Sequence, residues 1–597
     1  MKYKKHIAWG LAILILVASS FALIKRFNTH AQTGVTKTFT TKVTVGNSAP
    51  VFTVDPAESP ASSTTSPTAP NTLMTFSAKA TDANNHGYYF LVCSIVDTAN
   101  PDNDRAVASP TGGAPSCPAT STKYCGTTSA VASGSTASCT RTTESSDPYE
   151  NKWNAYVCDN FASGSSCSLP NRGSGASGSP FYVNHAPTFT AISNTASTVE
   201  DAQTPGNSYT VTWTSTASDP TDGHQVKLLI CKTQQMSNGV CTGGNWCEST
   251  LANSDPTCTY TLPAVPVADG EYEAYAYVVD AHNTPAAGEG TKQGSKSSYY
   301  VKNVAPVVSA VKLNAEASPI TLVAGGTKSV SITADVTDDN GCSATELPVT
   351  KIKAYVYRSG LANGFSDCDA LGDGNANYCY AEISCTRGTC SGTKVPITCS
   401  VSMQYYADPT DSNNAATSFA SQHWVATVKA TDNGFGTGGT NPLSHNATST
   451  AVVEVASLAA FNITASIDYD EVAAGERSGN GKLDKTIVTT PTGNVPMNQL
   501  YSGSNMCTDY DDCSTDAGYT PINVNKQKYA LAANTSYATG GTALSATPTL
   551  VNINVPKVTD GTNVTTRTSW WGIEIPTNTL PGVYNGLNTI TSQVKTT

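Results

Sequence analysis

The chain has 597 residues, of which 13% are charged and 8% aromatic, and its formal net charge is −11. That length is more than one hydrophobic core organises, so about three to five domains are expected. The acidic balance argues against a nucleic-acid-binding protein. A composition rich in Thr, Ser, Gly and Pro argues against a mainly helical fold and favours short strands joined by turns.

The first 26 residues differ from the rest of the chain. Lys2, Lys4 and Lys5 precede an apolar run over residues 7–24, and Lys25-Arg26 follow it. This run just reaches the length of a membrane span, whereas a cleaved signal peptide usually has a shorter apolar core. Residues 1–31 are therefore predicted as one hydrophobic helix, either a membrane anchor, which is preferred, or a signal peptide. Both alternatives export the chain, to the cell surface or as a secreted protein.

A short phrase, Asn-x-Ala-Pro, recurs at Asn47, Asn184 and Asn303. After each phrase the same strand pattern returns, in TFSAKATD (75–82), VTWTSTASD (211–219) and VSITADVTD (330–338). In the second copy Tyr209, Val211, Trp213 and Ala217 alternate with threonines, which indicates a half-buried strand facing its core with these four residues. Six or seven such strands fit between two phrases, as in an immunoglobulin-like (Ig-like) or fibronectin-III-like sandwich.

The fold class predicted from these repeats is all-β, with tandem antiparallel β-sandwiches of the Ig-like type after the N-terminal hydrophobic helix. The terminal range differs from the repeats and is predicted as a β-sandwich of another subtype. The predicted ranges are a linker or lead-in strand at 32–46, Ig-like domains at 47–185, 186–304 and 305–460, and a C-terminal β-sandwich at 461–597.

All 18 cysteines follow the leader, and the four domain ranges hold six, four, six and two of them. Even counts in an exported chain without Cys-x-x-Cys spacing predict disulfides closed within each domain. The short-range pairs Cys158–Cys167 and Cys385–Cys390 are predicted, and the other connectivities stay open. The predicted disulfide cysteines are Cys93, Cys117, Cys125, Cys139, Cys158, Cys167, Cys231, Cys241, Cys247, Cys258, Cys342, Cys368, Cys379, Cys385, Cys390, Cys399, Cys507 and Cys513.

Acidic and amide side chains mark one end of each predicted sandwich. The turn after the second strand, the turn after the penultimate strand and the incoming linker all lie at that end. Their oxygen atoms suit calcium (Ca2+), which takes about six to eight oxygen ligands. The alternative is that Asp and Asn serve only as turn residues. The candidate ligands are Asn184, Asp219, Asp222 and Asp280 in the second domain and Asn303, Asp338, Asp339 and Asp432 in the third, with Asn47, Asp82 and Asp159 as the counterparts in the first.

Two histidines of the second domain stand beside these acids, His224 near Asp222 and His282 near Asp280. Two histidines and two aspartates can hold a transition metal, although they can also be plain turn residues. The sequence contains no metalloprotease, serine-hydrolase or phosphate-loop motif, so an enzyme is not predicted.

Paired tryptophans, Trp570 and Trp571, lie on one strand of the terminal range. Their side chains point to opposite faces, so one belongs to the core and one could be presented to a sugar or partner.

The Asn-x-Ala-Pro joints, the TASDPTDG turn (216–223) and the Asp-Ala or Asp-Asn turn after the penultimate strand resemble prokaryotic cell-surface proteins with tandem Ig-like, fibronectin-III-like or cadherin-like repeats. The resemblance covers roughly residues 47–460 and implies adhesion, a stalk or surface-layer assembly. Cadherin-like repeats also imply calcium at the joints, although this chain lacks the full Asp-x-Asn-Asp-Asn joint motif.

The predicted function is that of a non-enzymatic structural or adhesive cell-surface protein, an Ig-like stalk that presents its terminal β-domain. One alternative is a self-assembling surface-layer or fibre subunit, and another is a secreted ligand- or carbohydrate-binding protein. The expected partners are the membrane, through residues 7–24 if the leader is retained, and other cell-surface proteins, glycans or further copies of the chain.

Overall fold

The structure is a computed structural model that describes residues 37–95, 105–370, 375–411, 419–436, 439–509, 513, 518 and 520–595. The hydrophobic helix predicted over residues 1–31 lies outside these ranges. Within them, no helix combines the length and the apolar character that crossing a bilayer requires. The chain separates into two compact units, the first formed by residues up to Ser63, Leu73–Thr142 and Asn151–Phe181, and the second by Thr64–Thr72, Thr143–Glu150 and Tyr182–Thr597.

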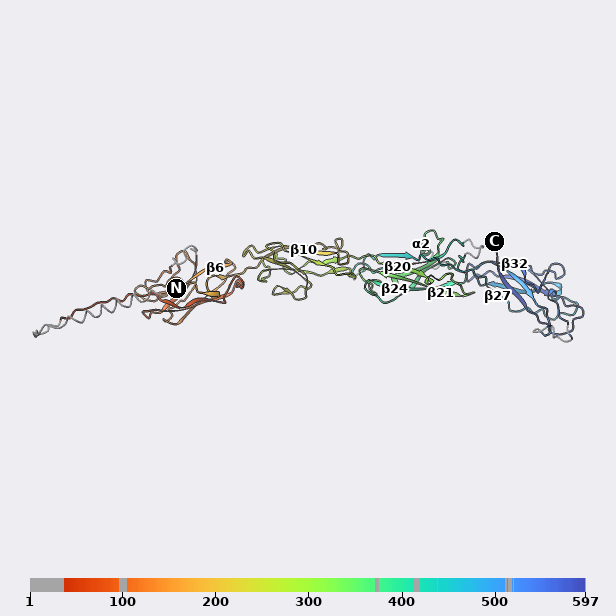
Figure 1. Ribbon diagram of the computed structural model, residues 1–597, viewed down its shortest axis with the longest axis horizontal. Coiled ribbons are helices and arrows are strands. Elements are labelled where there is room, and N and C mark those ends of the chain that lie inside the picture. Colours follow the sequence, from red (N-terminus) through yellow and green to blue (C-terminus); the bar gives the residue numbers. More distant parts are fainter. Residues whose placement is uncertain are drawn as a thin grey trace, which may run out of the picture. The chain divides into compact units, whose positions relative to one another are not determined.

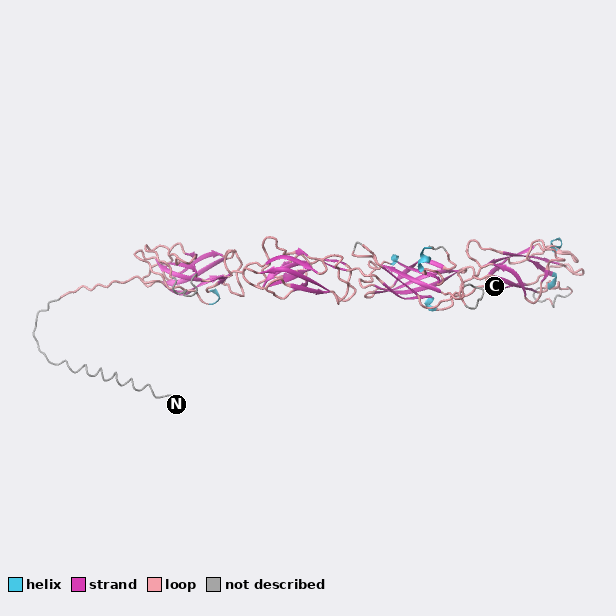
Figure 2. Cartoon of the chain, turned by 90° about the horizontal axis from the view of Figure 1, so that it is seen from above, coloured by secondary structure: helices cyan, strands magenta, loops and turns pink. Residues whose placement is uncertain are grey.

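The first Ig-like range consists of short strands (Figures 1 and 2). They are β1 Val51–Ser59, β2 Leu73–Thr81, β3 Tyr88–Ser94, β4 Lys123–Gly126, β5 Thr136–Thr142, β6 Glu150–Asn151, β7 Trp153–Asp159 and β8 Phe181–Tyr182, with a 3-10 turn at Gly175–Ser177. Two antiparallel sheets, β1-β2-β5 and β4-β3-β7, form the sandwich. Between them, Phe76 of β2 packs against Trp153 of β7 and Phe181 of β8, with ring centroids 5.4 and 6.1 Å apart, so this unit has its own aromatic core.

The second range repeats this architecture. Its strands are β9 Thr188–Asn194, β10 Thr210–Ser218, β11 Val226–Cys231, β12 Met236–Ser237, β13 Val240–Cys241, β14 Asn245–Glu248, β15 Thr257–Thr261, β16 Gly270–Tyr272, β17 Tyr275–Asp280, β18 Ser295–Lys296 and β19 Tyr299–Val301. The main sheets are β15-β10-β9 and β14-β11-β17-β18. Val211, Trp213 and Ala217 face the core as predicted, but Tyr209 precedes β10 and is 41% exposed, so its assignment to the core face was wrong.

The third range has longer strands. Its elements are β20 Val307–Leu313, η2 Asn314–Glu316, β21 Thr327–Thr337, η3 Val349–Lys351, β22 Ile352–Arg358, α2 Phe365–Ala370, β23 Cys379–Arg387, β24 Lys394–Gln404, β25 Trp424–Thr431 and β26 Ser444–Thr448. Because β23 pairs with both β22 and β24, the strands join into one seven-stranded sheet, β20-β21-β24-β23-β22-β25-β26. Val330, Ile332, Trp424 and Val428 belong to one continuous core.

The terminal range forms a second kind of sandwich. Its elements are β27 Phe461–Ile463, η4 Ser478–Gly481, β28 Lys485–Pro491, β29 Met497–Gly503, η5 Val524–Lys526, β30 Gln527–Ala530, β31 Thr542–Ala543, β32 Thr549–Val555, β33 Arg567–Ile573 and β34 Asn588–Val594. The sheets are β27-β28-β33-β30-β31 and β32-β29-β34. Trp571 is 1% exposed and packs on Tyr501 and Tyr529, whereas Trp570 is half-buried. The prediction that one of the two tryptophans is core is confirmed.

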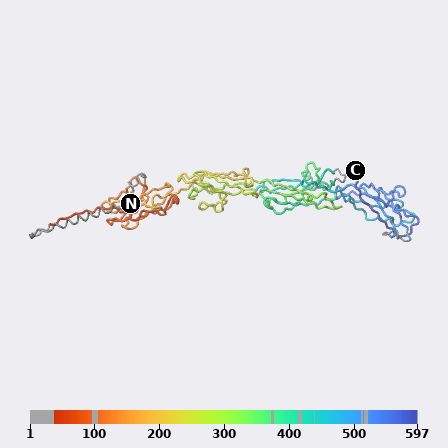
Figure 3. Tube along the Cα trace, viewed as in Figure 1, coloured from red at the N-terminus to blue at the C-terminus, as the bar shows by residue number. Residues whose placement is uncertain are grey.

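Each sheet is built from one of the four predicted ranges (Figure 3). Every named strand pairing is antiparallel. Short strands joined by turns, rich in Thr and Val, are what the composition favours, because β-branched side chains fit a pleated, half-buried surface.

All 18 cysteines are paired, and each of the nine disulfides closes within one range. Cys158–Cys167 is confirmed, but the predicted Cys385–Cys390 pair is wrong. Cys385 on β23 lies opposite Cys399 on β24 in the strand register, and the two bond at a Cα–Cα distance of 4.1 Å. The bonds are Cys93–Cys117, Cys125–Cys139, Cys158–Cys167, Cys231–Cys241, Cys247–Cys258, Cys342–Cys390, Cys368–Cys379, Cys385–Cys399 and Cys507–Cys513.

Candidate metal centre

A hydrogen-bonded Asn–Asp pair recurs at the end of each Ig-like domain where the Asn-x-Ala-Pro segment enters, which we term the N-terminal pole. The aspartate ends the penultimate strand or directly follows it, and the asparagine donates its Nδ2–H to the Oδ2 atom of that aspartate. The pairs are Asn47–Asp159 at 2.9 Å, Asn184–Asp280 at 2.5 Å and Asn303–Asp432 at 3.3 Å. The asparagine of each Asn-x-Ala-Pro phrase therefore makes the same hydrogen bond in all three domains.

A second aspartate follows the second strand of each domain. Its Oδ1 atom accepts a backbone N–H from its own turn, which fixes the carboxylate. These bonds are Asn84 N–H to Asp82 at 2.7 Å, Asp222 N–H to Asp219 at 3.1 Å and Asn340 N–H to Asp338 at 2.8 Å. The other oxygen, Oδ2, is buried in all three copies and has no hydrogen-bond partner among the described residues.

The asparagine Oδ1 atoms of Asn47, Asn184 and Asn303 are also buried without a hydrogen-bond partner in the described part of the chain. Buried polar atoms are nearly always hydrogen-bonded, so each exception needs an explanation such as an ion or a water molecule. The same two atoms are orphaned three times in three related domains. Their recurrence makes the three poles candidate sites for a cation or a water molecule.

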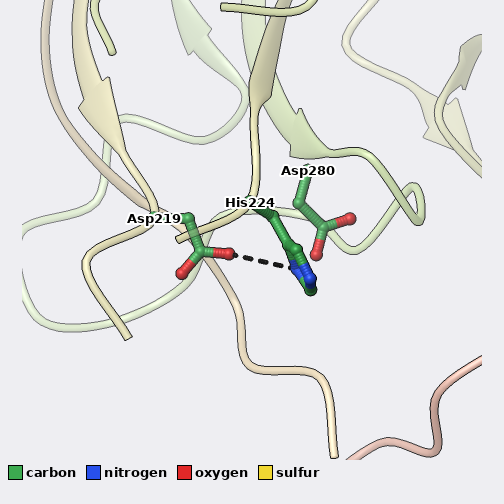
Figure 4. A group of neighbouring side chains, drawn as sticks. All are labelled: Asp219, His224 and Asp280. Atoms are coloured by element: carbon green, nitrogen blue, oxygen red, sulfur yellow. Dashed lines mark ion pairs between the residues drawn. The ribbon is translucent and has the colours of Figure 1, made fainter. Parts of the chain in front are cut away.

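In the second domain these groups include a histidine. Asp219 follows β10, His224 precedes β11 and Asp280 ends β17, and one ligand atom from each lies within 4.8 Å of the other two. Figure 4 shows the His224 ring between the two carboxylates. Asp219 and Asp280 are 4% and 1% exposed. Burial raises the pKa of Asp219, and the carboxylates of Asp222 and Asp280 raise it further while His224 opposes the shift.

The predicted ligand Asp222 belongs to a different interaction. Its Oδ2 accepts the backbone N–H of His185 at 2.5 Å and its Oδ1 lies 2.7 Å from His185 Nδ1. Sequence reasoning missed His185, although it stands inside the second Asn-x-Ala-Pro phrase. His282 lies beside the centre, because its ring centroid is 4.7 Å from that of His224.

The third domain gathers acids without a histidine. Burial, with the nearby charges of Asp432 and Asp339, raises the pKa of Asp338 to about 7. Burial and the carboxylates of Asp269, Asp338 and Asp432 raise the pKa of Glu346 to about 8. Glu346 Oε1 is buried without a hydrogen-bond partner among the described residues. The donor atoms that these acids offer at the third pole are therefore all oxygens.

Two of these acids were not predicted, and one predicted residue lies elsewhere. Asp269 comes from the preceding domain, and its Oδ2 accepts the Gly436 N–H at 2.7 Å. Neither Asp269 nor Glu346 lies directly after the second or the penultimate strand of its domain, where the repeated sequence patterns place the other aspartates. Asp339 is exposed, and the neighbouring Asn340 is buried in its place, donating to the backbone carbonyls of Val267 and Lys302 at 3.1 and 3.0 Å.

A cavity of about 540 Å³ lies in the terminal domain, over residues 469–481. Its lining is polar and includes Asp470, Glu471, Glu476 and Arg477. It shares no residue with the three poles, so it forms no part of the candidate ion sites.

No protein-family model matches the chain, and no curated protein matches it. Similar solved structures include a marsupial T cell receptor, at 9% identity over 64% of this chain and 97% of that chain with a TM-score of 0.22. Protocadherin gammaB7 EC3-6 matches at 12% identity over 80% of this chain and 88% of that chain, with a TM-score of 0.23. The chicken CNTN1 FN1-FN3 domains match at 6% identity over 67% of this chain and 98% of that chain, with a TM-score of 0.16. Because these TM-scores and identities are low, the evidence for the tandem Ig-like architecture is the strand pairing within the chain itself.

Proposed function

We propose that the chain is a non-enzymatic structural or adhesive protein that works outside the cell, with its Ig-like domains carrying the terminal β-domain. The observation that supports this most is the disulfide pattern, because all 18 cysteines are paired and every bond closes within one domain. Disulfides of this kind persist in oxidising compartments and reinforce domains with long polar loops.

Calcium is the proposed cofactor of the oxygen-only pole in the third domain. The carboxyl groups of Asp269, Asp338 and Asp432 each act electrostatically on Glu346, and buried like charges are costly unless an opposite charge offsets them. Calcium accepts carboxylate and amide oxygens in flexible geometry. Because Asp269 belongs to the second domain, a bound ion would also strengthen the joint between the second and third domains.

The location is tested on intact cells that make the chain. Protease added outside is expected to cleave it while cytoplasmic markers survive, and thiol labelling without reductant is expected to find no reactive cysteine. Protection from protease, together with labelled thiols, would contradict the proposal.

Calcium is tested by thermal unfolding of the full chain with a chelator and with millimolar calcium. The ion is expected to raise the unfolding midpoint by several degrees, an effect that Asp338→Asn abolishes. Asp339→Asn is the matched control, because Asp339 is adjacent but exposed. Imaging of the same samples separates the two alternatives, since ordered lattices indicate a surface-layer or fibre subunit and dispersed particles an adhesin or stalk.

A further inference from the structure

We propose that the N-terminal pole of the second domain binds a divalent transition metal of the Zn2+ class, with Asp219, His224 and Asp280 as ligands. The corresponding pole of the third domain is the one proposed to bind calcium, but the ligands of the second pole favour a different ion. The proposal deepens the candidate site and stands whether or not the third domain takes calcium.

The first support is geometric. One ligand atom from each of the three side chains lies within 4.8 Å of the others, although Asp280 ends β17, far in the sequence from the β10–β11 turn that holds Asp219 and His224. Asp219 Oδ2 and His224 Nδ1 lie 3.7 Å apart, which is too long for a hydrogen bond (Figure 4). Both atoms are buried without a hydrogen-bond partner among the described residues. A metal ion between them would satisfy both.

The carboxylates are already oriented for coordination. Asp280 Oδ1 accepts the backbone N–H groups of His282 and Thr284, each at 2.8 Å. Asp219 Oδ1 accepts the Asp222 N–H at 3.1 Å. The turn of Asp219 leaves its Oδ2 atom opposite His224 Nδ1, whereas the Oδ2 atom of Asp280 accepts the Nδ2–H of Asn184 at 2.5 Å. Second-shell hydrogen bonds of this kind fix the ligands of metal sites.

The donor set selects the class of metal. Calcium prefers hard oxygen ligands, whereas imidazole nitrogen suits zinc, copper, nickel and cobalt. Two carboxylates and a neutral imidazole carry a formal charge of −2, which a divalent ion balances. A tetrahedral site takes four ligands, and a water molecule can supply the fourth.

Comparison with the other poles supports this assignment. The first domain also has a histidine near its second-strand aspartate, but His86 stacks on Phe161 with ring centroids 4.9 Å apart. Its Nδ1 atom lies 3.8 Å from the Oδ1 atom of Asp82, which is already engaged by the turn. In the described part of the chain, the three-ligand group forms only at the second pole.

The experiment uses the full chain, freed of metal with a chelator and titrated with Co2+, whose visible absorption reports its ligands. We expect one Co2+ per chain, displaced by stoichiometric Zn2+ but not by a hundredfold excess of Ca2+. His224→Gln is expected to weaken Co2+ binding at least tenfold, and Asp219→Asn likewise. His86→Gln is the matched control and is expected to bind within twofold of the unmodified chain.

Three results would overturn the proposal: no saturable Co2+ absorption in folded protein, unchanged binding by His224→Gln, or displacement of Co2+ by calcium as readily as by zinc. Near-UV circular dichroism establishes folding for every variant. Should Asp219→Asn fail to fold, His224→Gln still decides, because that side chain is 16% exposed and makes no hydrogen bond in the described structure. Failure of the transition-metal proposal leaves the calcium test at Asp338 untouched, so the two proposals can fail separately.

Discussion

The N-terminal poles of the second and third Ig-like domains share a frame and differ in chemistry. In both, an asparagine of the linker contacts the aspartate at the end of the penultimate strand, and a second aspartate follows the second strand. The second pole adds His224, whereas the third adds Glu346 and, from the preceding domain, Asp269. The strand ends thus fix where the shared carboxylates stand, and the loops decide which further donor atoms lie beside them.

The largest expected effect tests the shared frame. Asp280→Ala and Asp432→Ala each remove an acceptor of two backbone N–H groups. Leaving buried donors unsatisfied costs about 2–4 kcal/mol of unfolding free energy in each domain, without metal. The matched variants Asp280→Asn and Asp432→Asn keep an acceptor oxygen and are expected to lose much less. Hydrogen exchange resolved by domain measures this, and equal losses for Ala and Asn would contradict it.

The second prediction exchanges the chemistry of the two poles. His224→Glu makes the second pole oxygen-only, so its affinity for Co2+ and Zn2+ is expected to fall at least tenfold while calcium begins to stabilise the domain. The reverse change, Glu346→His, is expected to create Co2+ absorption at the third pole. Titration of both variants with both ions is the measurement, and unchanged ion preference would show that the loops do not decide it.

The third prediction concerns pH without metal. The folded-state pKa of Asp338 is raised to about 7 and that of Glu346 to about 8, so the folded chain binds more protons than the unfolded chain between about pH 4 and 8. The contribution of these two groups to the stability of the third domain is therefore expected to be largest below about pH 4 to 5. It is expected to fall as the pH rises through 7 and 8.

Calcium is expected to remove most of that fall, because it stabilises the ionised carboxylates. Midpoints measured at pH 5, 6, 7 and 8, with chelator and with calcium, give the comparison. A midpoint that rises with pH in the chelator would contradict the raised pKa values. The stability of the second domain is expected to change with pH in the same direction, because burial also raises the pKa of Asp219.

The frame could be predicted from the sequence, because it follows from local patterns. Alternation in residues 211–219 and the repeated Asn-x-Ala-Pro phrase place Asn184, Asp219 and Asp280 at one end of a sandwich. The remaining residues could not be found this way. Asp269 reaches the third pole through a contact with Gly436, far away in the sequence, and the pairing of Cys385 with Cys399 depends on the register of two strands.

The smallest expected effect separates the metal centre from its surroundings. Asp222 was predicted as a ligand, but its carboxylate binds the backbone and ring of His185. Asp222→Asn keeps one acceptor oxygen and loses the charge that attracts the imidazole, so we expect a loss of about 0.5–1.5 kcal/mol in unfolding free energy. Co2+ affinity should stay within twofold of the unmodified chain. Chemical denaturation and Co2+ titration of one preparation test both points, and a tenfold loss of affinity would return Asp222 to the ligand set.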